Sequence, residues 1–209
     1  MIDRKCIIIC LTNERICAII LTTKTRKDCC VVKKSIIIDT ETTGLQAGLD
    51  EILQLSIIDT EDNTLYDGYF KPENHTSWEE AGRVNGITPE MVANCPSFKS
   101  ELSKINDIFQ DCEEIIGYNT PFDIGFLEAS GVTIPETVTF IDVMREFAPI
   151  YGEWSEKHQC YKWQKLTVCA NYYGFDWKSM AAHNSLADCC ATLFCYKQIL
   201  KSQGKRLSE

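Results

Sequence analysis

The spacing of apolar residues changes along the chain, and the first signal of a packed fold is the β-branched run from Ile36 to Ile38. A short apolar run of this kind, which ends at Asp39, indicates a buried central strand. Two further strands are expected from Ile52 to Asp59 and from Leu65 to Phe70, each reached through a short polar turn. Because short connections join antiparallel neighbours, the three segments predict an antiparallel meander.

Helices and strands alternate after the meander. The pair Thr88-Pro89 and the apolar face between Ser100 and Phe109 predict two surface helices. Further strands are expected over 115–118 and 138–141, and further helices from Asn119 to near Gly131, over 163–173 and over 186–203. The predicted fold class is α/β, a mixed five-stranded sheet flanked by helices, which forms one catalytic domain over residues 35–205.

Length and composition agree with one domain. The chain has 209 residues, 44% of them hydrophobic, which suffices for a sizeable core. No run approaches the roughly 20 apolar residues of a membrane-spanning helix, so no membrane association is expected. The 12 cysteines include the adjacent pairs Cys29-Cys30 and Cys189-Cys190, and adjacent cysteines rarely reach disulfide geometry. We therefore expect free thiols and a cytoplasmic protein.

Charge separates an N-terminal extension from the rest of the chain. Residues 1–34 hold eight Lys or Arg and three acids, whereas the remainder holds 13 bases and 27 acids. The extension could be a nucleic-acid arm, a partner-binding tail, an extra edge strand or a stretch read from a misassigned start. An acidic body argues against broad coating of nucleic acid, but carboxylates gathered around metal ions are compatible with a local basic groove.

Four carboxylates fall at strand ends or helix starts of this outline. Asp39 and Glu41 lie two residues apart on one strand and so project to the same face. Asp123 follows the next buried strand, and Asp188 lies in the first turns of the last helix, with His183 on the loop before it. Alone, each of these acids fits a solvated or helix-capping role. Together they would repel one another unless cations neutralised them, which predicts a metal site.

Three segments resemble the motifs of the His-bearing branch of the DEDD exonuclease superfamily, which has a ribonuclease H-like fold. The run from Asp39 to Leu45 is similar to the first motif, Asn119-x-x-x-Asp123 to the second, and His183-x-x-x-x-Asp188 to the third. The order and the approximate separations also agree. The branch includes the proofreading epsilon subunit of bacterial DNA polymerase III and ribonucleases that trim oligonucleotides.

The resemblance extends over residues 35–200 and has one departure. Many relatives carry His where this chain has Asn85, a position that we expect to lie outside the acidic cluster. Residues 1–34 have no counterpart in the family, so nothing is inferred for them from it.

The resemblance implies a two-metal mechanism. Two Mg²⁺ ions, or Mn²⁺ in their place, would be held by the four acids of the cluster: Asp39, Glu41, Asp123 and Asp188. His183 would act as general base on the attacking water, because an unperturbed histidine pKa of about 6.5 leaves it neutral near pH 7.

The same resemblance marks residues that would contact the terminal nucleotide. The candidates are Thr40, Thr42, Gly44, Leu45, Asn119 and Phe122. Leu45 would pack against the base, Phe122 either stacks or fills core, and Asn119 either binds the substrate backbone or braces the strand end. The aromatic and basic stretch 157–178 would contact a single strand or form a helix with core aromatics.

The function predicted is 3′→5′ exonucleolytic release of nucleoside monophosphates from DNA ends, in proofreading or repair. The expected partners are single-stranded 3′ ends of DNA or RNA and a DNA polymerase subunit. An exoribonuclease and a catalytically silent nucleic-acid- or polymerase-binding module are the alternatives, since the motifs alone do not separate DNA from RNA.

Overall fold

The computed structural model describes residues 8–12, 15–19, 34–177 and 184–205. The chain divides between Val32 and Lys33 into two compact units, and each is described by itself. In the first unit, β1 (Ile8–Thr12) pairs antiparallel with β2 (Arg15–Ile19), so the N-terminal extension contains a hairpin.

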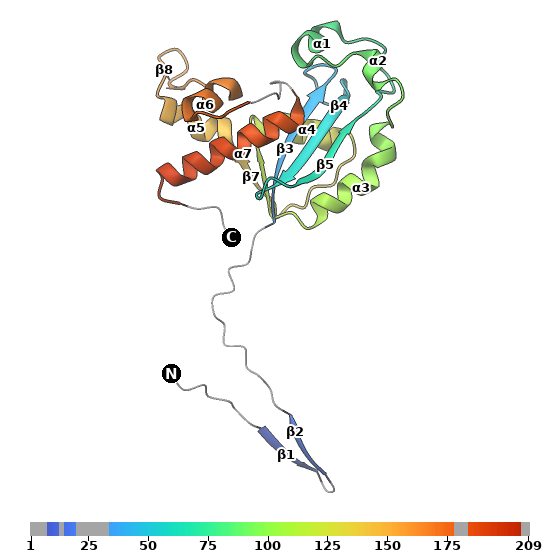
Figure 1. The fold of residues 1–209 in the computed structure, drawn as a ribbon, viewed down its shortest axis with the longest axis vertical. Coiled ribbons are helices and arrows are strands. Elements are labelled where there is room, and N and C mark those ends of the chain that lie inside the picture. The colour runs from blue at the N-terminus through green and yellow to red at the C-terminus, as the bar shows by residue number, and fades with distance from the viewer. Residues whose placement is uncertain (1–7, 13–14, 20–33, 178–183, 206–209) are drawn as a thin grey trace. The chain divides into compact units, whose positions relative to one another are not determined.

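The second unit is built on a mixed five-stranded sheet with the strand order β5-β4-β3-β6-β7 (Figure 1). The strands are β3 (Ser35–Thr42), β4 (Ile52–Asp59), β5 (Thr64–Tyr69), β6 (Glu114–Gly117) and β7 (Thr139–Asp142). The first three pair antiparallel, and β6 and β7 join them in parallel. The predicted α/β class, with a three-strand meander inside a five-stranded sheet, is confirmed.

The central strand β3 is buried on both faces. Ile36 and Ile38 pack into one hydrophobic cluster and Ile37 into the other, which explains why every position of this run is apolar. Pairing with β4 continues beyond the apolar run to Thr42. Asp39 and Glu41 therefore lie within the strand. Thr40 and Thr42 alternate with them and are buried.

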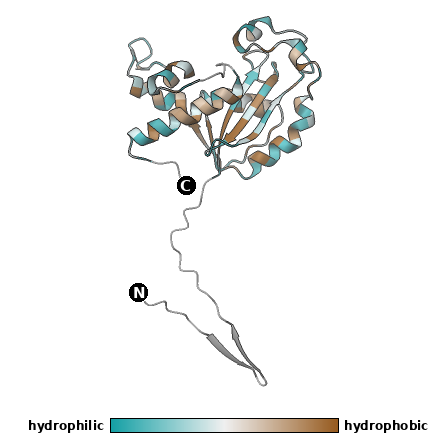
Figure 2. Cartoon of the chain, in the orientation of Figure 1, coloured by the Kyte–Doolittle hydropathy of each residue, from teal (hydrophilic) through white to brown (hydrophobic). Residues whose placement is uncertain are grey.

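Helices cover both faces of the sheet, whose strands are rich in hydrophobic residues (Figure 2). Apolar side chains of the sheet and the helices pack together in two clusters. One layer contains α3 (Phe98–Gln110) and α4 (Thr120–Ala129), which supply Phe109 and Phe126 to the first cluster. The other contains α5 (Val143–Tyr151), α6 (Leu166–Tyr173) and α7 (Ser185–Ser202). Helix α7 packs directly against β3 and β4, which determines what lies over the centre of the sheet.

Short elements complete the unit at its edges. Helices α1 (Glu79–Asn85) and α2 (Pro89–Val92) enclose a small cluster around Trp78, whose indole donates to the Ile87 carbonyl at 2.8 Å. Strands β8 (Trp154–Ser155) and β9 (Cys160–Tyr161) form a hairpin between α5 and α6. The helix predicted over 163–173 begins only at Leu166, because residues 162–165 form a connection outside any helix.

No helix in the described ranges has the length and apolar character needed to cross a membrane. The seven cysteines within residues 34–177 and 184–205 are all free.

Candidate active site

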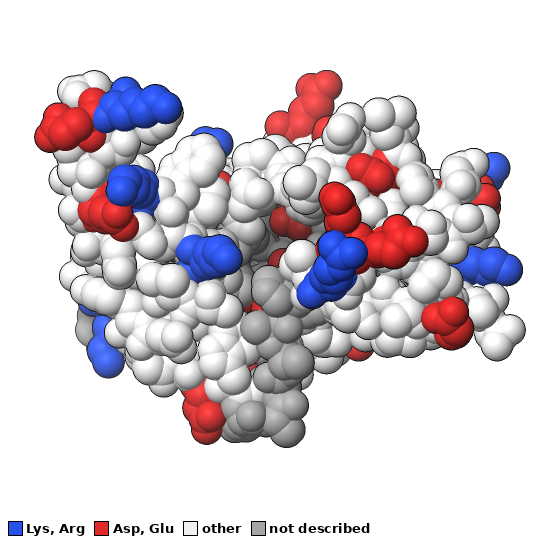
Figure 3. Space-filling view, turned by 90° about the horizontal axis from the view of Figure 1, so that it is seen from above, with Lys and Arg blue, Asp and Glu red and all other residues white. Residues whose placement is uncertain are grey.

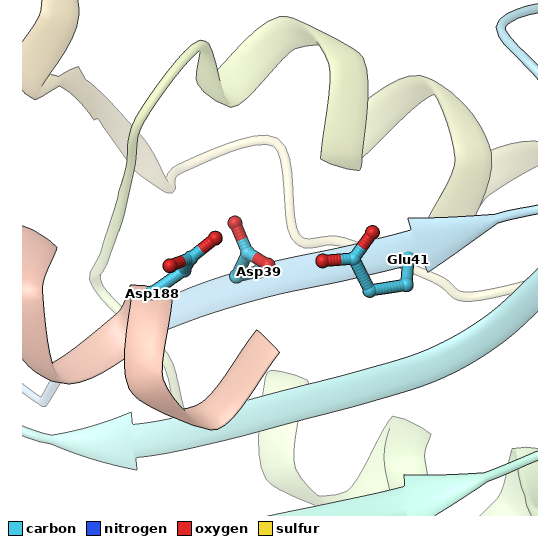
Figure 4. Close-up of side chains that lie close together, drawn as sticks. All are labelled: Asp39, Glu41 and Asp188. Atoms are coloured by element: carbon cyan, nitrogen blue, oxygen red, sulfur yellow. The ribbon is translucent and has the colours of Figure 1, made fainter. Parts of the chain in front are cut away.

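Three of the predicted acids converge where α7 crosses the sheet. Asp39 and Glu41 project from β3 toward Asp188 on α7 (Figure 4), and each contributes a carboxylate oxygen within 4.8 Å of the others. Local contacts hold this arrangement, because the Ser185 and Ser56 hydroxyls lie 2.6 Å apart and Ser56 is the pairing partner of Asp39 on β4. The start of α7 is thereby fixed to the strand beside the acids.

The fourth acid, Asp123, approaches from the other side of β3. It is buried in the first turn of α4, and its Oδ1 accepts from the Thr40 backbone N–H at 2.9 Å and the Thr40 hydroxyl at 2.7 Å. Thr40, a predicted substrate contact, therefore uses its hydroxyl to orient Asp123. The Asp123 charge still reaches Asp39 and Glu41, since it raises the pKa of both.

Burial and mutual repulsion both oppose ionisation of the cluster. Burial raises the pKa of Asp39 well above its usual value, and the charges of Asp123, Asp188 and Glu41 raise it further. Burial also raises the pKa of Glu41 to about 8 and that of Asp123 to about 7. Within the described ranges, no Lys or Arg forms an ion pair with Asp39, Glu41 or Asp123.

This donor set fits a divalent cation. Carboxylate oxygens are the ligands that Mg²⁺ and Mn²⁺ prefer, and a cation would offset the repulsion among these carboxylates. Asp39, Glu41 and Asp188 can therefore hold a metal ion, with Asp123 beside them.

Asn85 belongs to the cluster, and the expectation that it lies outside was wrong. Its side chain hydrogen-bonds to the Glu41 carboxylate and donates through Nδ2 to the Thr42 carbonyl at 3.2 Å. Its Oδ1 accepts from the Ile87 backbone N–H at 3.1 Å. The signal in the sequence was the family-like segment Asn85-Gly86-Ile87-Thr88, but only the packing of α1 brings it to β3.

Two clefts adjoin the acids, and Figure 3 shows acidic side chains recessed in the hollowed face. The smaller cleft, of about 620 Å³, is lined by Glu41, Thr42, Gly44 and Phe122, among others. The larger cleft, of about 880 Å³, contains Asp188. Leu45 and Val84 line both clefts and lie between them, and the Leu45 side chain is 84% exposed.

The loop after β3 is closed around Asp50. The Asp50 carboxylate accepts from the Gln46 backbone N–H at 2.8 Å, and a Cβ atom on Gly44 would collide with that carboxylate. A side chain at position 44 would therefore displace the Asp50 carboxylate from the loop, which presents Leu45 to solvent. The Thr42 hydroxyl donates to the Gly44 carbonyl within the same turn.

Asn119 and Phe122 are placed at the start of α4. Asn119 adopts a left-handed conformation with φ of 69°, and its backbone N–H donates to Asp142 at 3.0 Å, so its main chain is braced. Asn119 is exposed and lines the larger cleft. Phe122 packs against Phe126 with ring centroids 4.8 Å apart while also lining the smaller cleft.

His183, the predicted general base, lies outside the described residues. The next residue, Asn184, caps α7 by accepting from the Ala187 backbone N–H at 3.4 Å and donates to the Tyr69 hydroxyl at 3.1 Å.

Several known proteins are similar in sequence. The chain is 32% identical over 168 residues to the uncharacterized exonuclease CP81 of Escherichia phage 186, which covers 76% of this chain and 84% of that protein. It is 31% identical over 180 residues to RNA exonuclease 4 of Candida glabrata, covering 84% of this chain and 64% of that protein. The DNA polymerase III epsilon subunit of Haemophilus influenzae is 34% identical over 105 residues, 46% of this chain.

Some relatives extend far beyond the matched segment. The match spans 40% of the epsilon subunit and only 7% of the PolC-type DNA polymerase III of Pediococcus pentosaceus, which is 34% identical over 96 residues, 45% of this chain.

A solved structure shares the fold. E. coli exonuclease I, in complex with a dT13 oligonucleotide, superposes with a TM-score of 0.67 at 20% identity, over 82% of this chain and 42% of that one. This likeness shows the ribonuclease H-like fold.

The family model RNase_T, described as exonuclease, matches residues 36–196, which is most of the chain. The chain therefore belongs to the RNase T family of exonucleases.

Proposed function

We propose that this protein is a metal-dependent 3′→5′ exonuclease that releases nucleoside monophosphates from DNA ends, in proofreading or repair. The observation that carries the proposal is the convergence of Asp39, Glu41 and Asp188, whose oxygens lie within 4.8 Å of one another beside an open cleft. The 3′→5′ direction rests on the three sequence motifs. We assign the activity to residues 35–205 and treat residues 1–34 as an extension.

The four acids would hold two Mg²⁺ ions, which supply a nucleophile at neutral pH and stabilise the leaving oxygen of an in-line displacement. Thr40 fixes the Asp123 carboxylate, and Asn85 fixes that of Glu41. His183 would take the proton of the attacking water as general base.

The two clefts suggest how a strand end would bind. We place the terminal nucleotide in the smaller cleft, between Thr42 and Phe122, and the preceding nucleotides in the larger cleft. The exposed Leu45 side chain, which lies between the clefts, would pack against the terminal base and separate it from its neighbour.

RNA is the second candidate substrate, and the similarity to RNA exonuclease 4 favours it. The similarity to the epsilon subunit supports DNA and a polymerase partner. The two substrates differ at the 2′-hydroxyl, so relative rates on matched strands distinguish them.

Nucleotide release from labelled strands tests the proposal. Matched single-stranded DNA and RNA, labelled at either the 3′ or the 5′ end, are incubated with Mg²⁺, Mn²⁺ or EDTA. We expect a 3′ label to appear at once as mononucleotide and a 5′ label to give a shortening ladder, both only with metal.

Two variants complete the test. Asp39→Ala should abolish release, whereas Asp107→Ala, which removes an exposed acid on α3, should not change it. Release by Asp39→Ala at the native rate would refute the metal site, and immediate release of a 5′ label would refute the direction.

A further inference from the structure

Residues 162–165, between β9 and α6, border the larger cleft opposite α1. Trp163, Gln164 and Lys165 line this cleft together with Asp188. Two hydrogen bonds fix the segment: the Tyr118 hydroxyl donates to the Gln164 carbonyl at 2.9 Å, and the Gln164 amide donates to Glu153 at 3.0 Å. The side chains on either side of Gln164 are therefore presented from a preorganised backbone.

The aromatic and basic residues of the stretch 157–178 fall into two groups, those that pack or pair within the protein and those that line the cleft. Tyr172 and Tyr173 pack around Phe147, with ring centroids 5.3 and 5.8 Å from it, so they serve the fold. The Lys162 ammonium pairs with Glu153 at 2.6 Å. Trp163 differs, because its exposed side chain lines the cleft, whereas neither tyrosine does.

Cationic side chains lie at Trp163 and along the same cleft. The Arg145 guanidinium lies over the indole at 5.6 Å from the ring centroid and is itself held by Asp142, at 3.2 Å. This contact occupies one face of the indole. Lys165 is exposed and has no ion pair within the described part of the chain, and Arg83 lines the opposite side of the cleft.

We propose that Arg145, Trp163 and Lys165 form a binding ledge for the unpaired strand that precedes the terminal nucleotide. A base stacks on the free face of Trp163, and a phosphate contacts Lys165. Single-stranded nucleic acid fits because it offers stackable bases and phosphates together, which a cleft of aromatic and cationic side chains recognises without sequence preference. The ledge is continuous with the cleft that contains Asp188, and in this respect the inference rests on the proposed function.

Dependence on strand length tests the ledge. We would measure Kd by fluorescence anisotropy for 5′-labelled dT12 and dT2, and for the matching RNA strands. The buffer contains Ca²⁺ as the divalent cation, and each labelled strand is checked afterwards to be uncleaved. Trp163→Ala should raise the Kd for the 12-mer by about 10-fold, in line with the loss of one stacked base, and leave the dinucleotide within about twofold because it does not reach the ledge. Trp163→Phe keeps a stacking face and should give an intermediate Kd.

The charge contact has a separate signature. For single strands, each phosphate contact contributes about 0.7 to the slope of log K against log salt, so Lys165→Gln should flatten that slope by about 0.7. Phe140→Ala is the matched control, since Phe140 is a half-exposed aromatic on β7 that lines neither cleft.

The outcomes separate the ledge from the proposed function. A length-dependent loss in Trp163→Ala supports the ledge even if the native protein releases no nucleotide. An unchanged Kd for dT12, or equal losses for dT2 and dT12, overturns it even if the exonuclease activity is present. The ledge is also overturned if Trp163→Ala changes only self-association or binding to other proteins and leaves strand binding unchanged.

Discussion

The side chain of Asn85 gives the sharpest test of how the site is built. It donates to the Thr42 carbonyl and hydrogen-bonds to Glu41, whose half-buried carboxylate lies among other acids. Asn85→Ala removes both contacts and leaves the Glu41 charge with less compensation. A hydrogen bond to a charged group contributes about 1.5–3 kcal/mol, and residues that orient metal ligands typically affect metal affinity or activity by about 10- to 100-fold.

We therefore expect Asn85→Ala to lower kcat/KM by roughly 10- to 100-fold, since each 1.36 kcal/mol corresponds to about a factor of ten. Part of the loss should be recovered by raising the Mg²⁺ concentration, because the change weakens the orientation of a ligand. The assay is steady-state release of nucleotide from a short oligonucleotide across a Mg²⁺ titration.

Three further variants separate this role from general destabilisation. Asn85→Asp has nearly the same shape but brings a like charge to Glu41, so it should lose more activity than Asn85→Ala. Asn85→His restores a donor and should lose less. Asn171→Ala, on the exposed surface of α6, should match the native enzyme. Native kcat and native Mg²⁺ dependence in Asn85→Ala would refute the reasoning.

Three other predictions concern stability. Asp39→Asn should raise the Tm in EDTA, because it removes one of the buried like charges, and should reduce the gain in Tm that Mg²⁺ gives the native protein; an unchanged Mg²⁺ response would contradict the ligand role. Partial burial opposes ionisation of Glu51, but hydrogen bonds from His75 and the backbone of residues 73–75 outweigh it and lower the pKa of Glu51 below its usual 4.5. The stabilisation is therefore present above pH 4.5 and lost as pH falls through the lower folded pKa, so urea unfolding of Glu51→Gln should show a deficit at pH 7 that shrinks in acid. Phe109→Ala empties a fully buried site and should cost about 3–5 kcal/mol in the same assay, with an unchanged m-value; a cost under 1 kcal/mol would contradict the packing.

The elements that could be predicted have strong local signals. The bounds of β4, Ile52–Asp59, agree with the apolar run in the sequence. Helix α1 was not predicted because none of its residues is buried, so it lacks an apolar stripe. Helix α5 carries Pro149 in its interior, which weakens a helical signal. The sequence predicted that a helix begins at Trp163, but contacts of Gln164 with Glu153 and Tyr118 hold residues 163–165 outside α6.

The site was predictable to different degrees at different positions. The common face of Asp39 and Glu41 follows from the two-residue period of a strand. The meeting of Asp188 with them depends on α7 folding back over β3, and only the order of the motifs indicated it. The contact between Asn85 and Thr42 spans 43 positions in sequence and depends on how α1 packs, for which the sequence has no periodic signal.

Contacts that do not involve like charges hold the acids together. The Ser56–Ser185 hydrogen bond joins β4 to the start of α7, and the Thr40–Asp123 bonds join β3 to α4. Because these contacts join protein groups to one another, the fold itself orients the carboxylates, and a bound cation would relieve their repulsion. A site organised in this way needs little rearrangement on binding, which favours catalysis by fixed charges. It also explains why this part of the sheet carries buried polar residues where packing alone would favour apolar ones.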